Sequence, residues 1–351
     1  MHRNEGPQVT AIRELEIRRH QFHGIPDARL RTALIFLAAA VAGTPAGAAP
    51  AADYPTRPIR FVVPFAAGGT SDIIGRILSA RMQESLGQSL VVDNRGGAGG
   101  SIGTDIVAKA NPDGYTLVLG SNGTHAIVPY LYKNLPYDPI KDFTPVSMVV
   151  ITPTVLAATP DLPVRSVKDL IALAKAKPGA LAYGSSGVGS TTHIAGEMLA
   201  SMAGIQLNHV PYKSASAAYP DVFSGRVALI FDTALSMLQH IKAERVRPLA
   251  VTTPARASIL PNLPTISEAG VPGYALTLWI AIYAPAGTPA TIVARLNKEI
   301  QQALNLPEVR EQMTLQGAEV AVGSSADLLA ATRTDLKRMG ELVRAAKIAA
   351  Q

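Results

Sequence analysis

Two segments of this chain carry an apolar strand into a glycine-rich turn and then into a helix that starts with Ser or Thr. The first covers residues 61–72 and the second covers residues 181–193. The start of a helix has unpaired N–H groups and the positive end of the helix dipole, so it attracts anions. Two such turns in one chain predict an anion held between two domains.

Strands and amphipathic helices alternate along the rest of the chain, which predicts an α/β fold with mostly parallel sheets. Thr70 or Ser71 is expected to cap the first helix, and residues 121–125 read as a polar loop. Strands are expected at residues 59–65, 90–92, 115–120, 207–210, 228–231 and 246–252. Helices are expected at residues 72–86, 102–110, 166–177, 192–203, 215–224, 234–243, 290–304, 307–316 and 325–349.

Two extended apolar stretches, residues 143–158 and 274–283, interrupt this alternation and read as crossings between domains. They predict a discontinuous first lobe, residues 53–155 and 274–351, and a second lobe, residues 156–273. A ligand would then lie in the cleft between the lobes.

Residues 1–52 read as a leader with an extended n-region, an apolar core at residues 32–42 and small residues after it. We expect a cleaved signal peptide, with the cut near residues 46–53, and export to the periplasm. The chain has no cysteine, so it can form no disulfide and carry no lipid on a cysteine after the signal.

The charge of the chain is only mildly basic, with 32 Lys and Arg against 26 Asp and Glu. Removing the first 48 residues takes away six basic and four acidic residues, which leaves 26 against 22. Aromatic residues make up 5% of the chain, and no basic run is interleaved with them. This balance suits a small acidic ligand and argues against nucleic-acid binding.

The two turns lack the residues that nucleotide sites require. The second turn has no Lys of the GxxxxGK[ST] kind, and Thr192 stands where a dinucleotide fingerprint needs its third Gly. A serine hydrolase with Ser185 or Ser186, His193 and Asp232 is the alternative, although the segment is not GxSxG. The His193–Glu197 spacing is more typical of a surface pair than of a metal site.

Three single residues leave two interpretations open. Lys213 follows a strand end and is either solvated or a charge in the cleft. Asp232 follows a strand and either caps the next helix or faces the ligand. Trp279, the only Trp of the chain, either packs in the core or stacks on a ligand.

Seven motifs occur in an order that resembles the Bug proteins, the periplasmic solute receptors of tripartite tricarboxylate transporters. They are YPxRPI (54–59), PFAAGGxxD (64–72), VDNRGGAGG (92–100), NPDGYTL (111–117), GVGSxxH (187–193), VPYK (210–213) and APAGTP (284–289). The resemblance covers residues 53–340. The chain departs from the family pattern at Ser214 and Ser224, where glycine is usual.

The resemblance implies a two-lobed type II periplasmic-binding fold that closes on a carboxylate held by backbone amides. Carried over by position, it implicates the first turn, Asn122, the second turn and Asp232. The implicated residues are Ala67, Gly68, Gly69, Thr70, Asp72, Asn122, Ser185, Ser186, Gly187, Ser190, Thr191, His193 and Asp232.

We therefore expect a receptor and not an enzyme, with no cofactor and no metal. Its expected partners are a small organic carboxylate and the membrane subunits of the transporter, and the receptor itself is expected to be a monomer. Neither turn contains Arg or Lys, which favours a small mono- or dicarboxylate over a citrate-like trianion. An exported serine hydrolase acting on a small ester is the alternative function.

Overall fold

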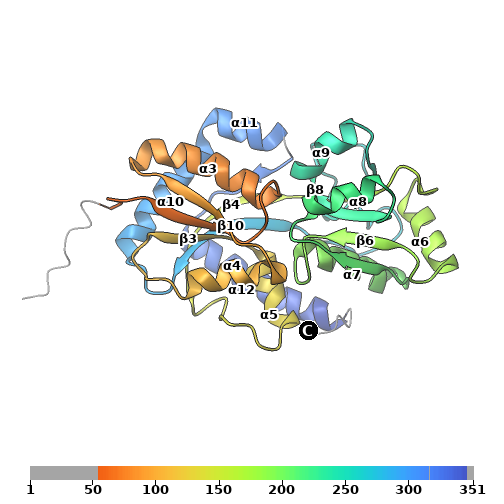
Figure 1. Ribbon diagram of the computed structural model, residues 1–351, viewed down its shortest axis with the longest axis horizontal. Helices are drawn as coiled ribbons and strands as arrows, with labels where there is room; N and C mark the ends of the chain where they lie inside the picture. The colour runs from red at the N-terminus through yellow and green to blue at the C-terminus, as the bar shows by residue number, and fades with distance from the viewer. Residues whose placement is uncertain (1–53, 316, 346–351) are drawn as a thin grey trace, which may run out of the picture. The chain divides into compact units, whose positions relative to one another are not determined.

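The computed structural model describes residues 54–315 and 317–345. The expected leader, signal peptide and cleavage region lie outside these residues. The described chain is built around two β-sheets, and helices cover both faces of each sheet (Figure 1). We call the layers around the sheet that contains β1 the first lobe and those around the other sheet the second lobe.

The first lobe has a six-stranded sheet in the order β11-β4-β10-β3-β1-β2. Its strands are β1 (Ile59–Val63), β2 (Leu90–Asn94), β3 (Thr116–Ser121), β4 (Phe143–Thr152), β10 (Leu278–Pro285) and β11 (Glu319–Val320). All eight residues of β10 are buried, as expected for a strand covered on both faces. The helices are α3 (Thr70–Leu86), α4 (Ser101–Ala108), α5 (Val128–Leu131), α10 (Ala290–Asn305), α11 (Pro307–Leu315) and α12 (Ser325–Ala345).

The second lobe has a five-stranded sheet in the order β7-β6-β8-β5-β9. Its strands are β5 (Thr154–Ala158), β6 (Ala182–Ser185), β7 (Asn208–Pro211), β8 (Leu229–Thr233) and β9 (Arg247–Val251). Its helices are α6 (Val167–Ala176), α7 (Thr191–Ala203), α8 (Tyr219–Phe223) and α9 (Ala234–Lys242). Helices α6 and α7 pack on one face of the sheet, and α8 and α9 pack on the other (Figure 1).

The prediction of mostly parallel sheets is wrong. Strand β10 is antiparallel to β3 and to β4, β11 is antiparallel to β4, and β5 is antiparallel to β8 and to β9. The parallel pairs are β1 with β2 and β3, and β6 with β7 and β8. The reason is the double crossing, because β5 and β10 enter their sheets from the other lobe and not through a helix on the same sheet.

The chain passes from the first sheet to the second at Pro153, between β4 and β5. It returns between β9 and β10, where the Leu276 amide donates to the Thr252 carbonyl at 2.8 Å. Both passages fall in the stretches expected to cross. The lobe limits at residues 155/156 and 273/274 stay a prediction.

Most expected helices and strands are present, with shifted ends, but two local predictions are wrong. Residues 121–125 do not form a loop, because β3 runs to Ser121 and a π-helical turn, η4, covers Gly123–Ile127. Helix α3 is capped by Gly69, without a side-chain hydrogen bond, and not by Thr70 or Ser71. Among the described residues, no helix combines the length and apolar character needed to cross a membrane.

Candidate functional site

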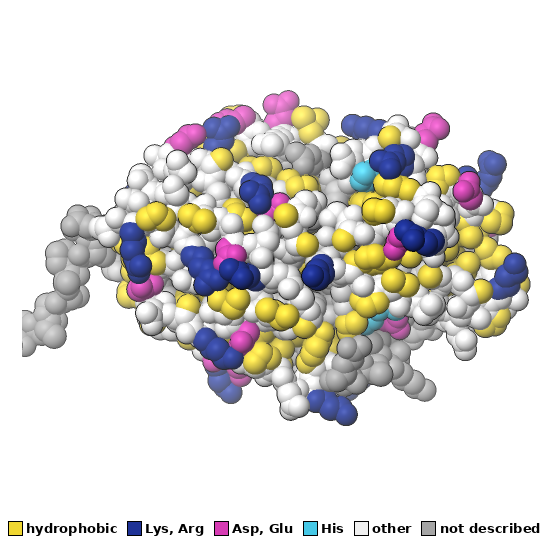
Figure 2. Space-filling view, viewed as in Figure 1, with side chains coloured by type: hydrophobic (Ala, Val, Ile, Leu, Met, Phe, Trp, Pro, Cys, Tyr) yellow, Lys and Arg dark blue, Asp and Glu magenta, His cyan; other side chains and the backbone are white. Residues whose placement is uncertain are grey.

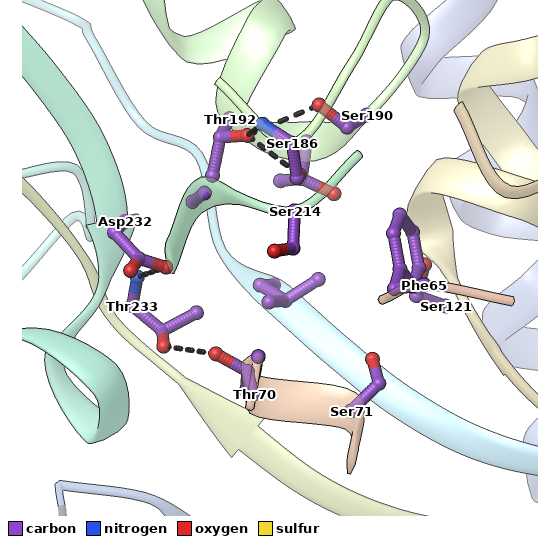
Figure 3. Close-up of a pocket in the computed structure, with 14 residues that line it drawn as sticks. Phe65, Thr70, Ser71, Ser121, Ser186, Ser190, Thr192, Ser214, Asp232 and Thr233 are labelled. Carbon is purple, nitrogen blue, oxygen red and sulfur yellow. Dashed lines mark hydrogen bonds between the residues drawn. The ribbon is translucent and has the colours of Figure 1, made fainter. Parts of the chain in front are cut away.

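A pocket of about 50 Å³ lies where the two lobes meet. Figure 3 shows Asp232 and Thr233 on one side of it and Phe65 and Ser121 on the other. Its lining contains nine hydroxyl side chains and a single ionisable group. The lining residues are Phe65, Gly69, Thr70, Ser71, Ser121, Ser186, Ser190, Thr191, Thr192, Ser214, Ala215, Asp232, Thr233 and Leu278.

The first turn presents the N-terminus of α3 to this pocket. Gly69 is extended (φ −86°, ψ 171°), and the first backbone amide of the helix with an internal acceptor is that of Ile73. The amides of Thr70 and Ser71 therefore donate to no acceptor within the described part of the chain. These two N–H groups are available to an anion in the pocket.

Asp72 shapes this turn and lies outside the pocket lining. Its carboxylate accepts from the Gly68 amide at 2.9 Å and pairs with Arg76 at 3.0 Å. Burial raises the pKa of the Asp72 carboxyl, but the hydrogen bonds from Arg76 and Gly68 outweigh it, so the pKa is lowered. Gly68 has a φ of +78°, a conformation that favours glycine. Asp72 thus holds the turn in shape.

The second turn presents the N-terminus of α7. The Ser190 hydroxyl caps this helix by accepting from the His193 amide at 3.2 Å and donates to the Gly187 carbonyl at 2.7 Å. Thr192 Oγ1 lies 2.8 Å from Ser186 Oγ and 2.9 Å from the Ser186 amide. Within the described residues, the amides of Thr191 and Thr192 donate to no protein acceptor. The α7 end therefore matches the α3 end in its free donors.

A third helix, α9, starts at the pocket, which the sequence analysis did not foresee. Thr233 caps it by accepting from the Ser236 amide at 3.3 Å, so the cap falls one residue after Asp232. Thr70 Oγ1 reaches across from α3 to Thr233 Oγ1 at 2.5 Å and to Ser236 Oγ at 2.8 Å. The starts of α3 and α9 are thereby joined across the two lobes.

Asp232 is buried in the wall of the pocket, with 4% of the residue exposed. Its Oδ1 accepts from the Thr233 amide at 2.7 Å, and its Oδ2 accepts from the Tyr219 hydroxyl at 2.9 Å. Burial raises the pKa of the Asp232 carboxyl to about 7, against the opposing effect of these two hydrogen bonds. Of its two interpretations, the structure therefore favours the one in which Asp232 faces the pocket.

The structure brings six of the thirteen expected residues into the pocket lining: Gly69, Thr70, Ser186, Ser190, Thr191 and Asp232. The other seven lie outside the lining: Ala67, Gly68, Asp72, Asn122, Ser185, Gly187 and His193. As ligand-binding residues, all thirteen stay predictions.

Asn122 is outside the lining because both ends of its side chain amide are occupied. Its Nδ2 donates to the Thr277 carbonyl at 2.9 Å, and its Oδ1 accepts from the Thr191 hydroxyl at 2.8 Å. The Thr191 bond joins the two lobes beside the pocket. Asn122 positions Thr191.

Eight lining residues are not among the thirteen expected from the sequence, and three of them, Ser121, Thr233 and Leu278, lie at strand ends. Ser214 precedes the 3-10 turn η5 (Ala215–Ala218), and Thr233 precedes α9, so both lie where a short polar residue starts a helix. That pattern was visible in the sequence. The sequence could not identify Leu278 as a lining residue, because it is one apolar residue in an apolar strand.

The hydrolase alternative receives no geometric support from the residues named for it. His193 Nδ1 accepts from the Gly189 amide at 3.2 Å, and Asp232 bonds to Tyr219 and Thr233. Ser185 Oγ lies 2.6 Å from His209 Nε2, a contact that the sequence analysis did not anticipate. Neither Ser185 nor Ser186 is linked to His193, so these side chains form no Ser-His-Asp relay.

His193 is not part of a surface pair, because only 6% of the residue is exposed. Burial, followed by the nearby His209, lowers the pKa of His193 to about 3. Its Nε2 lies 3.9 Å from Glu197, but a neutral imidazole makes no ion pair there. No cluster of three or more His, Cys, Asp or Glu suited to a metal occurs within residues 54–315 and 317–345.

Charged side chains lie outside the pocket, except for Asp232. Lys213 is exposed and is not a lining residue, and Trp279 is buried in the core with its Nε1 donating to Asp335. On the face shown in Figure 2, Lys and Arg are spread over both lobes among Asp and Glu. Among the described residues, the pocket lining therefore offers an anion no Lys or Arg.

Comparison with known proteins shows which family has this architecture. The profile of the tripartite tricarboxylate transporter family receptor matches residues 74–348. BugT of Bordetella pertussis (strain Tohama I) is 37% identical over 311 residues, which cover 88% of this chain and 94% of BugT.

Two solved structures have a similar fold over most of this chain. R. palustris Rpa4515 with adipate is 41% identical with a TM-score of 0.83, over 85% of this chain and 100% of that chain. MatC (Rpa3494) from Rhodopseudomonas palustris with bound malate is 31% identical with a TM-score of 0.80, over 83% and 100%. The two-lobed periplasmic-binding fold expected from the sequence is confirmed.

Proposed function

The chain belongs to the tripartite tricarboxylate transporter receptor family, which includes the Bug proteins, and from this premise we propose that it binds a small organic carboxylate between its lobes. Family members are periplasmic solute receptors. We further propose that this chain is exported by its leader and delivers the bound carboxylate to the membrane subunits of a tripartite tricarboxylate-type transporter.

One observation carries the proposal: the residues at the starts of α3 and α7, whose amides donate to no acceptor among the described residues, line a single pocket from opposite lobes. A carboxylate has about four acceptor positions on its two oxygens, so it can accept from both helix ends at once. Charge-assisted hydrogen bonds of this kind are stronger than neutral ones. A ligand that bridges the lobes stabilises the closed state, and no chemical step is required.

The adipate and malate held by the two related structures agree with a carboxylate ligand. The pocket in this chain is small and its lining holds no Arg or Lys. Both features favour a small carboxylate held by neutral donors over a trianion of the citrate kind, which requires paired cations.

A thermal-shift screen of carboxylates against their uncharged amides tests the proposal, for example butyrate against butyramide. A ligand at 100 times its dissociation constant adds about 2.7 kcal/mol to the free energy of unfolding. We expect at least one carboxylate to raise the melting temperature while its amide does not. Turnover of a small ester, without stabilisation by any carboxylate, would instead support the hydrolase alternative.

A further inference from the structure

Among the residues that the structure describes, Asp232 is the only ionisable side chain in the pocket lining, and it is buried there without a cationic partner. Asp232 accepts hydrogen bonds from two uncharged donors, the Tyr219 hydroxyl and the Thr233 amide. A carboxylate in a site for carboxylates repels its own ligand unless the ligand turns another group toward it. The group of the ligand that lies against Asp232 is therefore not expected to be an ionised carboxylate.

The acceptor capacity of Asp232 is only partly used. Each of its two oxygens accepts one hydrogen bond from the protein, whereas the two oxygens together offer about four acceptor positions. Because Asp232 lines the pocket, its remaining acceptor positions lie at the pocket wall. A ligand group that donates a hydrogen bond can fill them, whereas an ionised carboxylate cannot.

The three helix ends at the pocket also differ in charge. Asp232 lies at the start of α9 and accepts from the Thr233 amide there, so that positive helix end already has a carboxylate of the protein. The first turns of α3 and α7 keep their free amides and have no acid that accepts from them inside the pocket. The unused donors for a ligand carboxylate are therefore at the starts of α3 and α7, and Asp232 lines the same pocket (Figure 3).

We propose that Asp232 determines specificity by accepting a hydrogen bond from a hydroxyl or ammonium group of the ligand, so that the pocket selects small carboxylates that carry such a donor. This inference rests on the proposed function and narrows it. It predicts discrimination against a ligand whose second group is a fully ionised carboxylate.

Two matched ligand series test the inference by calorimetry at pH 7.5. The first is butyrate, 4-hydroxybutyrate, 4-aminobutyrate and succinate, and the second is hexanoate, 6-hydroxyhexanoate, 6-aminohexanoate and adipate. Within each series only the end group changes. We expect the hydroxy or amino member of at least one series to bind at least tenfold more tightly than its methyl and carboxylate counterparts.

The substitution Asp232→Asn removes the charge, and the Tyr219 hydroxyl can accept from the new amide. It should reduce the affinity ratio of the amino ligand to the dicarboxylate by at least tenfold. Asp221→Asn is the matched control, because Asp221 accepts from Tyr212 in the same lobe but does not line the pocket. A purely structural role of Asp232 would weaken all ligands alike and leave this ratio unchanged.

The outcomes separate the two proposals. If the wild type binds the dicarboxylates most tightly, or if Asp232→Asn leaves the ratio within threefold, the inference is overturned while the carboxylate receptor stands. If the wild type binds no member of either series and no carboxylate of the thermal-shift screen stabilises it, the proposed function fails with it. If Asp232→Asn does not fold, the end-group preference of the wild type still decides.

Discussion

The contact between Gly99 and the second turn offers a direct test of lobe closure. Gly99 belongs to the 3-10 turn η3 (Ala98–Gly100) in the first lobe and has a φ of +64°. A Cβ at this position would lie 2.2 Å from the Val188 carbonyl oxygen and 3.2 Å from Gly189, both in the second lobe. The lobes approach so closely here that only glycine fits.

The substitution Gly99→Ala has two costs. The left-handed backbone costs about 1–2 kcal/mol for a residue with a Cβ, whether or not the lobes are closed. If the lobes close on the ligand as proposed, the collision with the Val188 backbone arises only in the closed state, and overpacking of this kind typically costs about 1–3 kcal/mol. Since about 1.4 kcal/mol is a factor of ten in affinity, we expect a dissociation constant raised about 5-fold to 150-fold.

Gly87→Ala is the matched control, because Gly87 has a φ of +66° and nothing lies within 4 Å of a Cβ there. Both variants should lose similar free energy of unfolding in urea titrations. Calorimetry with the carboxylate that stabilises the wild type most should then show weaker binding for Gly99→Ala alone. Affinities of the two variants that agree within twofold would show that this contact plays no part in the liganded state.

Three further outcomes are expected. Ser186→Ala should weaken carboxylate binding by about 0.5–3 kcal/mol in calorimetry, the range for one hydrogen bond, with the upper end for a charged ligand; an unchanged affinity would remove its hydroxyl from the site. Burial lowers the pKa of His125 and of His193 to about 3, below the unfolded value of about 6.5, so stability is lost as the pH falls below 6.5. Below pH 6.5 each of these two His takes up a proton on unfolding, whereas Asp232, whose folded pKa is raised to about 7, releases one. The net uptake is about one proton, so the free energy of unfolding falls by at least about 1.4 kcal/mol per pH unit near pH 5. Urea titrations at pH 7, 6 and 5 check this, and constant stability would contradict it. N-terminal sequencing of periplasmic material should find a start between residues 46 and 53, and a start before residue 33 would refute the signal peptide.

The fold could be predicted from the sequence where local chemistry decides the structure. Apolar runs marked the strands, and Gly87 and Gly204 end α3 and α7 in left-handed conformations, as C-terminal glycines do. Strand direction could not be predicted in this way. Whether β5 and β10 run parallel or antiparallel to their neighbours depends on the crossings between lobes, which no local pattern encodes.

The candidate site likewise has features that depend on neighbouring residues, which could be predicted, and features that depend on residues distant in sequence, which could not. The two turns were recognisable because a helix start with free amides is a local feature. The side chains that complete the pocket come from elements distant in sequence, such as Thr233 against Thr70. Asp72 and Asn122 lie outside the pocket lining, where their hydrogen bonds to Gly68 and Thr191 hold the walls, and their contact with a ligand stays a prediction.

The central claim is that backbone amides at the helix starts hold a carboxylate, and one pair of variants at Gly69 tests it most directly. Gly69 lines the pocket, and its amide, like those of Thr70 and Ser71, donates to no acceptor among the described residues. Its φ of −86° is about 20° from the value that proline adopts. An alanine Cβ would lie 3.4 Å from Ser214 Cβ, an ordinary contact. Gly69→Pro therefore removes an N–H that Gly69→Ala keeps.

Calorimetric titration of both variants with the carboxylate that stabilises the wild type most gives the answer. We expect Gly69→Ala to bind within threefold of the wild type and Gly69→Pro to bind at least tenfold more weakly. Equal affinities of the two variants would contradict it.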